Sequence, residues 1–408
     1  MKKNLKLGLF GFGCVGQGLY HVLHETQGVK AEIKKICVKH KNKQRPLAED
    51  LFTFSKEDIL NDPEIDVVVE LIDDAVAAYE IVKAALLNGK AVVTANKNML
   101  AEHLEEIYDL QKKTGKPVLY EGAVCGSIPI LRNLEEYYDN DLISSIEGIF
   151  NGSTNYILTK VFEEHKSYGD ALLRAQELGF AESDPRLDVQ GYDAKYKLVI
   201  AITHTFGVFV KPEDVVNIGI DRISDLDLKF ARENHYAIKL IARAFKLKGK
   251  IYGFVVPQFV QATNPLASVR NEYNAVQVEG AFAEKQLFIG KGAGSYPTGS
   301  AVLSDISALT YDYAYEYKKL HQGAHWEFAS DILVEAFVSF DHKAQISIGD
   351  FETFKSGYAA NGTQYMLGQV RLSKLLHWYD SFGAGIILAP ESTFVPLENL
   401  RERVEATN

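Results

Sequence analysis

The first part of the chain, up to about residue 141, alternates between short apolar runs and longer amphipathic stretches. Runs rich in β-branched residues predict strands, and the amphipathic stretches between them predict helices. The expected strands cover residues 5–10, 33–38, 67–72 and 91–94, and the first expected helix covers residues 15–24. Strands that alternate with helices in this way form parallel sheets with helices on both faces. We therefore expect an α/β fold that begins with a doubly wound parallel sheet.

The rest of the chain follows a less regular pattern. Strands are expected at 146–150, 251–256, 275–278 and 286–289, and helices at 156–164, 171–177 and 192–207. A helix expected at 300–319 follows a Gly-rich turn, and we expect it to pack back onto the first domain. The tail has expected strands at 332–340, 365–370 and 385–388 and a helix at 372–381. The pattern predicts a first domain of residues 1–142 plus about 300–320, an α+β domain of residues 143–299, and a small C-terminal α+β domain of residues 328–408.

Charge and composition narrow the class of protein. The formal net charge is −10 with acidic and basic residues interspersed, which argues against nucleic acid or an anionic membrane as the main partner. No apolar run is long enough to span a bilayer, and no cleavage site follows the N-terminal lysines, so we expect neither a membrane segment nor a signal peptide. Cys14, Cys37 and Cys125 are odd in number and far apart, which is typical of a reducing compartment. We expect a cytoplasmic protein.

A glycine motif stands between the first expected strand and the first expected helix. Gly11-Phe12-Gly13-Cys14-Val15-Gly16 has the form G-x-G-x-x-G. In this context Gly11 makes a tight turn, Gly13 lets a pyrophosphate approach the backbone, and Gly16 lets helix and strand pack closely. The phosphates would meet the exposed N–H groups at the positive end of the helix, where Cys14 and Val15 lie. The motif predicts a Rossmann-type dinucleotide site; the alternative is a tight turn without a ligand.

The second expected strand bears on which dinucleotide is bound. An NAD enzyme usually has a carboxylate there for the ribose 2′-hydroxyl. Here the strand ends Cys37-Val38-Lys39-His40-Lys41, with positive charge and no acid. Because a charge-assisted hydrogen bond contributes ~1.5–3 kcal/mol, Lys39 on a 2′-phosphate would favour NADP. The alternative is a solvated basic turn, and NAD remains possible.

Three polar segments interrupt otherwise apolar surroundings, at residues 94–97, 121–129 and 175–197. In the last, Asp193 and Lys197 are four residues apart at the start of a helix and share a face. Without further context such a pair is most often an exposed salt bridge. Glu182, Asp184 and Asp188 precede that helix in a loop dense in carboxylates, which suits a cationic group such as the ammonium of an amino acid.

These segments resemble the motifs of homoserine dehydrogenases. The resemblance covers residues 175–197, the turn Asn151-Gly152-Ser153-Thr154-Asn155, and Val93-Thr94-Ala95-Asn96-Lys97, and it extends in order over about residues 5–315. The residues from Asn274 to Val276 and from Gly290 to Thr298 also match. It implies NAD(P)-dependent interconversion of L-homoserine and L-aspartate 4-semialdehyde in threonine, methionine and isoleucine biosynthesis.

The resemblance also implies roles for individual residues. Lys197 and Lys97 would be catalytic, with Asp193 beside Lys197. The residues implied near the substrate are Glu182 and Asp188 at its ammonium, Thr154 and Gly152. Those implied near the cofactor are Gly11, Gly13, Cys14, Val15, Gly16, Lys39, Thr94, Asn96, Lys97 and Gly292, with Ala293 and Gly294 beside Gly292. A monovalent cation, sodium or potassium, would be held by Glu121 and the backbone of Val124, Gly126 and Ile128.

The resemblance further implies a homodimer formed through the middle domain. The tail resembles a small regulatory ACT-type domain only in its rhythm of strands and helix. One departure is plain: Asp73-Asp74 stands where family members usually have Gly-Gly. Two carboxylates there would be unfavourable if they faced the phosphates of the cofactor.

Two other functions are compatible with parts of the sequence. An NADP-dependent semialdehyde dehydrogenase that oxidises the aldehyde would need a Cys nucleophile with a His partner. Cys125 is the only candidate outside the cofactor strands, and no nearby motif supplies a histidine. A non-catalytic NADP-binding regulator would have no use for Glu182, Asp188, Asp193 and Lys197 together.

Overall fold

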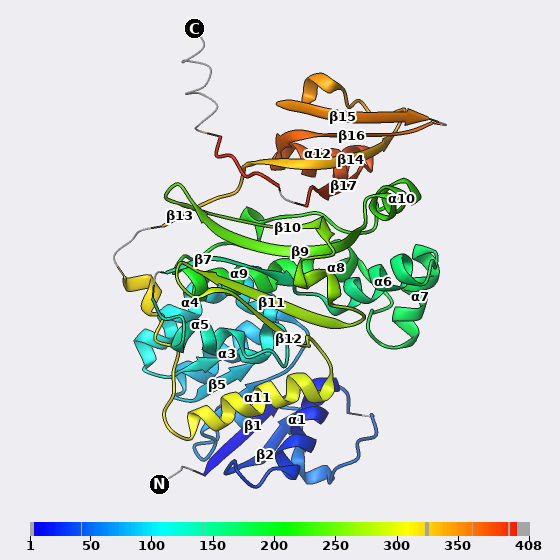
Figure 1. The fold of residues 1–408 in the computed structure, drawn as a ribbon. Helices are drawn as coiled ribbons and strands as arrows, with labels where there is room; N and C mark the ends of the chain where they lie inside the picture. The colour runs from blue at the N-terminus through cyan, green and yellow to red at the C-terminus, as the bar shows by residue number, and fades with distance from the viewer. Residues whose placement is uncertain are drawn as a thin grey trace. The chain divides into compact units, whose positions relative to one another are not determined.

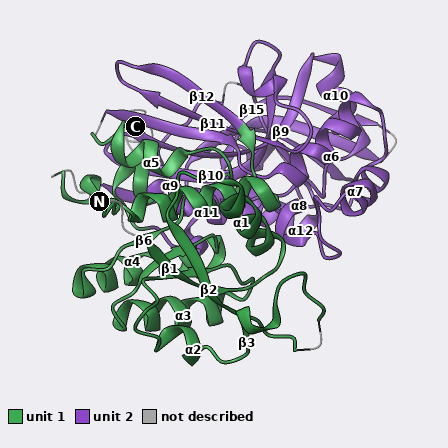
Figure 2. Ribbon diagram, turned by 90° about the horizontal axis from the view of Figure 1, so that it is seen from below, with its two compact units in different colours: residues 1–141, 203–209, 290–322 green, residues 142–202, 210–289, 323–408 purple. Residues whose placement is uncertain are grey.

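The computed structural model describes residues 4–41, 43–140, 142–322, 326–360, 362–390 and 392–397. The chain divides into two compact units, shown in two colours in Figure 2. Unit 1 contains Met1–Asp141, Thr203–Phe209 and Gly290–Gln322, and unit 2 contains Leu142–Ile202, Val210–Ile289 and Gly323–Asn408. The tail is thus grouped with the middle of the chain, and the division into three domains stays a prediction.

Unit 1 is built on a six-stranded sheet in which every neighbouring pair is parallel (Figure 1). Its strands are β1 (Leu5–Phe10), β2 (Ala31–Cys37), β3 (Phe52–Thr53), β4 (Val67–Glu70), β5 (Ala91–Thr94) and β6 (Val118–Leu119), in the order β3-β2-β1-β4-β5-β6. The strand order reverses between β1 and β4, and doubly wound sheets bind ligands at such a switch point. The expectation of a parallel, doubly wound sheet is confirmed.

The helices of unit 1 are α1 (Cys14–Glu25), α2 (Glu57–Leu60), α3 (Ala75–Leu87), α4 (Lys97–Thr114), α5 (Ile130–Glu136) and α11 (Ser295–Leu309). Helix α11 lies against α1, as the sequence predicts for the segment after the Gly-rich turn. The predicted bounds of 300–319 are wrong. The helix begins five residues earlier because Gly299 and Ser295 both meet the backbone of α1 at Gly18, and it ends at Leu309, before the left-handed residue Asp312.

Unit 2 is built on a mixed sheet of eleven strands. They are β7 (Ile143–Ile149), β8 (Val216–Asn217), β9 (Tyr236–Leu247), β10 (Lys250–Gln261), β11 (Tyr273–Gly280), β12 (Glu284–Lys291), β13 (Glu327–Ala329), β14 (Leu333–Asp341), β15 (Thr353–Ala360), β16 (Thr363–Arg371) and β17 (Gly385–Leu388). The order is β12-β11-β7-β9-β10-β17-β14-β16-β15, with β8 and β13 also paired to β10. The second domain of mixed strands and helices that the sequence predicts is therefore present as a mixed sheet.

The helices of unit 2 are α6 (Gly152–Glu163), α7 (Tyr168–Glu177), α8 (Arg186–Val189), α9 (Tyr192–Phe206), α10 (Asp225–Glu233) and α12 (Leu372–Phe382). The last turn of α9, from Thr203 on, belongs to unit 1. One apolar core joins β9 and β10 to β14, β17 and α12, so the tail packs on the middle of the chain. Trp378 on α12 is among the largest side chains that this core buries. Among the described residues, no helix combines the length and the apolar character needed to cross a bilayer.

Candidate active site

The glycine motif forms the turn between β1 and α1. Gly11 has φ +94°, and a Cβ there would lie 2.5 Å from the carbonyl oxygen of Leu71, so only glycine fits. At Gly16 a Cβ would lie 2.6 Å from the Gly11 carbonyl oxygen, whereas at Gly13 it would meet nothing within 4 Å. Gly13 caps α1 with no side-chain hydrogen bond, so the first N–H groups of the helix remain available. These features suit a pyrophosphate at the helix start.

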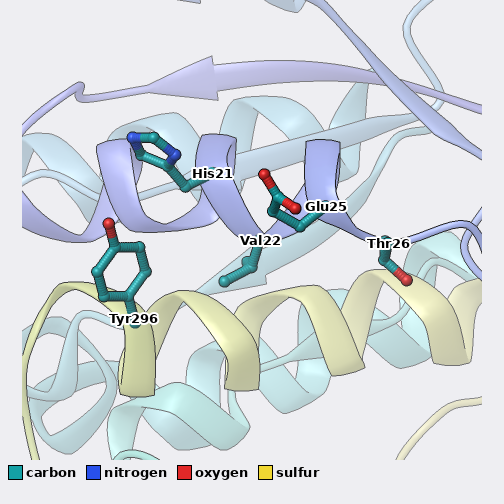
Figure 3. Close-up of a pocket in the computed structure, with 5 residues that line it drawn as sticks. All are labelled: His21, Val22, Glu25, Thr26 and Tyr296. Carbon is teal, nitrogen blue, oxygen red and sulfur yellow. The ribbon is translucent and has the colours of Figure 1, made fainter.

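The packing of α1 on α11 fixes the direction of this helix. Tyr296 of α11 and the C-terminal half of α1 line a surface hollow of about 470 Å³, drawn in Figure 3, with the rings of His21 and Tyr296 5.9 Å apart. The hollow lies at the opposite end of α1 from the Gly-rich turn, and none of the predicted site residues lines it. It is therefore distinct from the expected phosphate position.

Charged side chains follow both β2 and β4 in the chain. Lys39 is exposed just beyond the end of β2. Asp73 and Asp74 are exposed as well, and the Asp74 carboxylate accepts a hydrogen bond of 3.0 Å from the Ala77 backbone N–H. Asp74 is thus the N-cap of α3, a role for which aspartate is among the preferred residues.

Thr94, Asn96 and Lys97 follow the end of β5. The Thr94 hydroxyl donates a 2.6 Å hydrogen bond to Glu70, and the Asn96 side chain caps α4 and donates to the carbonyl of Ile72. Lys97 is the first residue of α4 and is partly buried. Glu70 is fully buried, and burial raises its pKa to about 7. Thr94 and Asn96 therefore hold the loop that positions Lys97, and Glu70 is a buried acid that the sequence reading did not single out.

Glu121 lies in the interior of unit 1. Its two carboxylate oxygens accept hydrogen bonds from the backbone N–H groups of Leu131 and Arg132, at 2.8 and 2.9 Å. Burial, with the neighbouring carboxylate of Asp305, raises the pKa of Glu121 to about 8. Arg132 forms an ion pair with Asp305 at 2.8 Å. With its pKa at about 8, the carboxyl of Glu121 is mostly protonated near neutral pH, and a nearby monovalent cation would favour its charged form.

The other residues predicted at the cation site follow Glu121 in a tight loop. Val124 and Ile128 are buried, and Gly126 has φ +55°. A Cβ on Gly126 would lie 2.7 Å from the carbonyl of Gly292, so the loop touches the segment before α11 that the cofactor prediction includes. The described residues contain no group of three or more His, Cys, Asp or Glu side chains arranged for a metal ion. The donors here are backbone oxygens and one carboxylate, a set that suits sodium or potassium better than a transition metal.

Asn151 is the centre of the polar cluster in unit 2. Its side-chain oxygen accepts a 2.8 Å hydrogen bond from the Thr154 backbone N–H and so caps α6. Its amide nitrogen donates to Asp188 at 2.7 Å and to Asp193 at 2.8 Å. One amide thus joins two carboxylates from α8 and α9. At Gly152, the next residue, a Cβ would lie 2.5 Å from the Glu272 carbonyl oxygen, so the turn requires glycine.

Lys197 completes the cluster. Its ammonium donates to the Asp193 carboxylate at 2.7 Å and to the Phe150 carbonyl at 2.8 Å. Both Lys197 and Asp193 are only 6% exposed, so the exposed salt bridge that the sequence left open is excluded. An ammonium has three N–H donors, and two are used here.

The predicted substrate residues differ in their surroundings. Thr154 is fully buried, and its hydroxyl donates to the Asn151 carbonyl. Asp188 is partly buried in the cluster, whereas Glu182 is exposed in the loop before α8. Asp184, in the same loop, forms an exposed ion pair with Arg186, which lowers its pKa to about 2. The structure therefore brings Asp188, Asp193 and Lys197 together, whereas Glu182 is exposed in the preceding loop.

Two asparagines were not assigned from the sequence. Asn151 stands first in the turn that resembles the family motif, but its two carboxylate partners lie 37 and 42 residues further along the chain. Asn274 donates to the Phe150 carbonyl at 3.0 Å, and its side-chain oxygen is buried without a hydrogen-bond partner. Its place at the start of β11, within a segment that matches the family motif, is the signal that could have identified it.

Comparison with known proteins agrees with this arrangement. The family model described as "Homoserine dehydrogenase, NAD binding domain" matches residues 11–121, and the one described as "Homoserine dehydrogenase" matches residues 129–307. The homoserine dehydrogenase of Bacillus subtilis is 35% identical over 382 residues, covering 89% of this chain and 87% of the relative. That of Helicobacter pylori is 40% identical over 317 residues, covering 75% of this chain and 74% of the relative.

Solved structures give the same result. The crystal structure of a homoserine dehydrogenase from Thiobacillus denitrificans superposes with a TM-score of 0.82 at 29% identity, covering 95% of this chain and 98% of that one. A hyperthermophilic archaeal homoserine dehydrogenase in complex with NADPH superposes with a TM-score of 0.67 at 27% identity, covering 76% and 99%. The chain therefore belongs to the homoserine dehydrogenase family and carries that family's NAD-binding domain.

Proposed function

We propose that this chain interconverts L-homoserine and L-aspartate 4-semialdehyde with NADP(H) as the preferred cofactor, in the biosynthesis of threonine, methionine and isoleucine. The observation that carries the proposal is the buried cluster of Asp188, Asp193 and Lys197 joined by Asn151. The cluster contains two carboxylates, the kind of group that binds an ammonium, next to a lysine that uses two of its three N–H donors in the hydrogen bonds described above. Membership of the family supports the same reaction.

Lys197 and Lys97 are the proposed catalytic residues. One of the two lysines, in its neutral form, accepts the hydroxyl proton of homoserine, and the ammonium of the other donates to the same oxygen and stabilises the charge that develops there. Asp193 orients the Lys197 ammonium, and Asn151 fixes Asp193 in turn. Asp188 and Glu182 bind the substrate ammonium, with Thr154 and Gly152 shaping the turn beneath it. Lys97, at the start of α4, is the second lysine of the reaction.

The cofactor would be held by the Gly-rich turn and the segments beside it. The turn residues Gly11, Gly13, Cys14, Val15 and Gly16 hold the pyrophosphate through backbone N–H groups. Lys39 binds the 2′-phosphate, which favours NADP over NAD. The remaining proposed cofactor residues are Thr94, Asn96, Lys97 and Gly292. When bound, the nicotinamide supplies the hydride acceptor.

A sodium or potassium ion is proposed at Glu121 and the backbone oxygens of Val124, Gly126 and Ile128. The buried carboxyl of Glu121, whose pKa is raised to about 8, supports it, because a bound cation would stabilise the charged form of that group. A cation there would brace the loop that touches Gly292. We also propose a homodimer formed through the middle of the chain, an ACT-like C-terminal domain and a cytoplasmic location, on the strength of the family resemblance.

The rival functions lose support. Aldehyde oxidation through an acyl-enzyme would need an accessible thiol, and Cys125 is fully buried. A regulator that only binds NADP would not need the buried ion pair of Lys197 and Asp193 in unit 2. Burying two charged groups costs free energy of folding, so a pair without a function would not be expected there.

The test is a turnover assay with purified protein, L-homoserine and NADP in a buffer free of phosphate and coenzyme A. We expect NADP reduction that depends on homoserine. Reduction that appears only with the semialdehyde plus phosphate or coenzyme A would indicate the aldehyde-oxidising enzyme. NADP binding without turnover would indicate the regulator.

A further inference from the structure

A tyrosine from the tail contacts the loop that follows β8. The Tyr379 hydroxyl, on α12, donates a 2.5 Å hydrogen bond to the Asp221 carboxylate. Tyr379 is buried, and its burial together with this hydrogen bond raises its pKa, so the hydroxyl stays protonated and keeps donating. The contact therefore joins the C-terminal helix to the segment of residues 217–221.

The segment 217–221 in turn holds the end of α8. The Asn217 side chain donates to the Gln190 carbonyl at 2.8 Å, and the Ile220 N–H donates to the Val189 carbonyl at 2.7 Å. A longer contact of 3.4 Å runs from the Gln190 amide to Asp221. A Cβ on Gly219 would lie 2.3 Å from the Val189 carbonyl oxygen, so the two stretches of backbone touch directly.

The residues held in this way form the junction between α8 and α9. Gly191, with φ +83°, turns the chain there, and its N–H donates to the Asp188 carbonyl at 2.9 Å. Asp188 stands just before the junction and Asp193 just after it. Both carboxylates must reach the same amide nitrogen of Asn151, so their positions depend on the geometry of this turn.

We propose that Tyr379 is a positioning residue for the substrate: through Asp221 and the segment 217–221, it holds the α8–α9 junction so that Asp188 and Asp193 stay aligned. The inference rests on the proposed function, since it assigns Asp188 to the substrate ammonium. A cavity of about 300 Å³ borders both Tyr379 and Gln190, which leaves the junction room to shift when the hydrogen bond is absent.

Tyr379→Phe tests the proposal, because it removes only the hydroxyl. We expect the KM for homoserine to rise about fivefold, the factor that corresponds to the loss of one ordinary hydrogen bond. The KM for NADP should stay essentially unchanged, since the Gly-rich turn is not touched, whereas kcat should fall by a smaller factor, because Asp193 also orients Lys197. Tyr358→Phe is the matched control: Tyr358 lies on β15 in the same tail, is exposed, and should leave all three constants unchanged.

Hydrogen exchange followed by mass spectrometry gives a readout that needs no substrate. In Tyr379→Phe the backbone amides of residues 186–193 should exchange faster, whereas those of α1 should not change. An unchanged homoserine KM together with unchanged exchange would overturn the proposal, whether or not the melting temperature falls. If the wild-type protein does not oxidise homoserine, the proposed function fails, while the exchange experiment still decides whether Tyr379 holds the junction.

Discussion

Lys197 and Asp193 form an ion pair of 2.7 Å, one helical turn apart on α9, that is almost excluded from solvent. We expect Lys197→Ala to lower kcat by about 10²–10⁴-fold, the usual contribution of general acid–base catalysis. Affinity for NADP should be unchanged, because the proposed phosphate contacts lie in the turn before α1. Steady-state kinetics and cofactor titration measure the two effects.

Lys160 offers a matched control for that variant. It pairs with Glu164 at 2.5 Å with the same spacing on α6, but at the surface. Lys160→Ala should leave kcat unchanged, because exposed pairs of this kind contribute only ~0.2–0.5 kcal/mol to stability. Lys197→Arg should not restore activity, since a guanidinium does not give up a proton near neutral pH. A near-wild-type kcat in Lys197→Ala would remove this residue from the mechanism.

Asn151 allows its helix-capping role to be separated from its role in the cluster. Asn151→Ser keeps an oxygen that can cap α6 but loses the amide that donates to Asp188 and Asp193. Hydrogen bonds to charged groups contribute ~1.5–3 kcal/mol, so kcat/KM for homoserine should fall about tenfold to a hundredfold. Ser167→Ala removes the comparable cap of α7 and should lower stability without changing kcat/KM. Equal kcat/KM for homoserine in the two variants would show that Asn151 acts only as a helix cap.

Cofactor preference should depend on Lys39. The wild type should have the higher kcat/KM with NADP, and Lys39→Ala should reduce the ratio of kcat/KM for NADP to that for NAD, because the charge that meets the 2′-phosphate is lost. Lys30→Ala, at an exposed position before β2, is the control and should leave the ratio unchanged. Equal use of both cofactors by the wild type would contradict the assignment.

The cation proposal predicts a dependence on the buffer salt. Replacing sodium and potassium by choline should lower the melting temperature and the turnover, because the charged form of Glu121 would lose the cation that stabilises it. Glu121→Gln should make the protein indifferent to that exchange. Equal stability of the wild type in choline and potassium would leave the site without support.

Glu70 should make stability depend on pH. Burial raises its pKa to about 7 from an ordinary value of 4.5, so the folded state binds its proton more tightly than the unfolded state. The contribution of this group to the free energy of unfolding is therefore complete below about pH 4.5 and is lost as the pH rises to about 7, in total roughly 3 kcal/mol. Glu70→Gln should flatten urea-unfolding stability across this interval. A pH profile identical to that of the wild type would show that Glu70 ionises normally.

The sequence predicts those strands whose apolar run matches their burial in the fold. The buried strands β1, β4 and β5 are apolar apart from Lys6, Glu70 and Thr94, as is typical of central parallel strands, and the sequence predicts them almost to the residue. Strand β9 was not predicted, because Lys239 and Arg243 interrupt its apolar run. Lys239 is nevertheless buried, since the Asn155 side chain and the Val269 carbonyl accept its hydrogen bonds.

The same limit applies to the candidate site. The spacing of Asp193 and Lys197 is visible in the sequence, but their burial is not, because it depends on α6, β7 and β11 folding around them. The role of Asn151 depends on its hydrogen bonds to Asp188 on α8 and Asp193 on α9. Such contacts between distant residues cannot be inferred from one sequence unless a family resemblance points to the motif.

The packing of α11 against α1 has a consequence for synthesis of the chain on the ribosome. At Gly18 a Cβ would lie 2.0 Å from the Ser295 carbonyl oxygen, so this face of α1 is shaped for a helix that is made much later. Between Asp141 and Gly290 the ribosome must add about 150 residues, which takes roughly 7–30 s at about 5–20 residues per second. Until then the nascent nucleotide-binding unit has an uncovered helix. We expect truncated chains that end before Ser295 to be captured by chaperones rather than to bind cofactor.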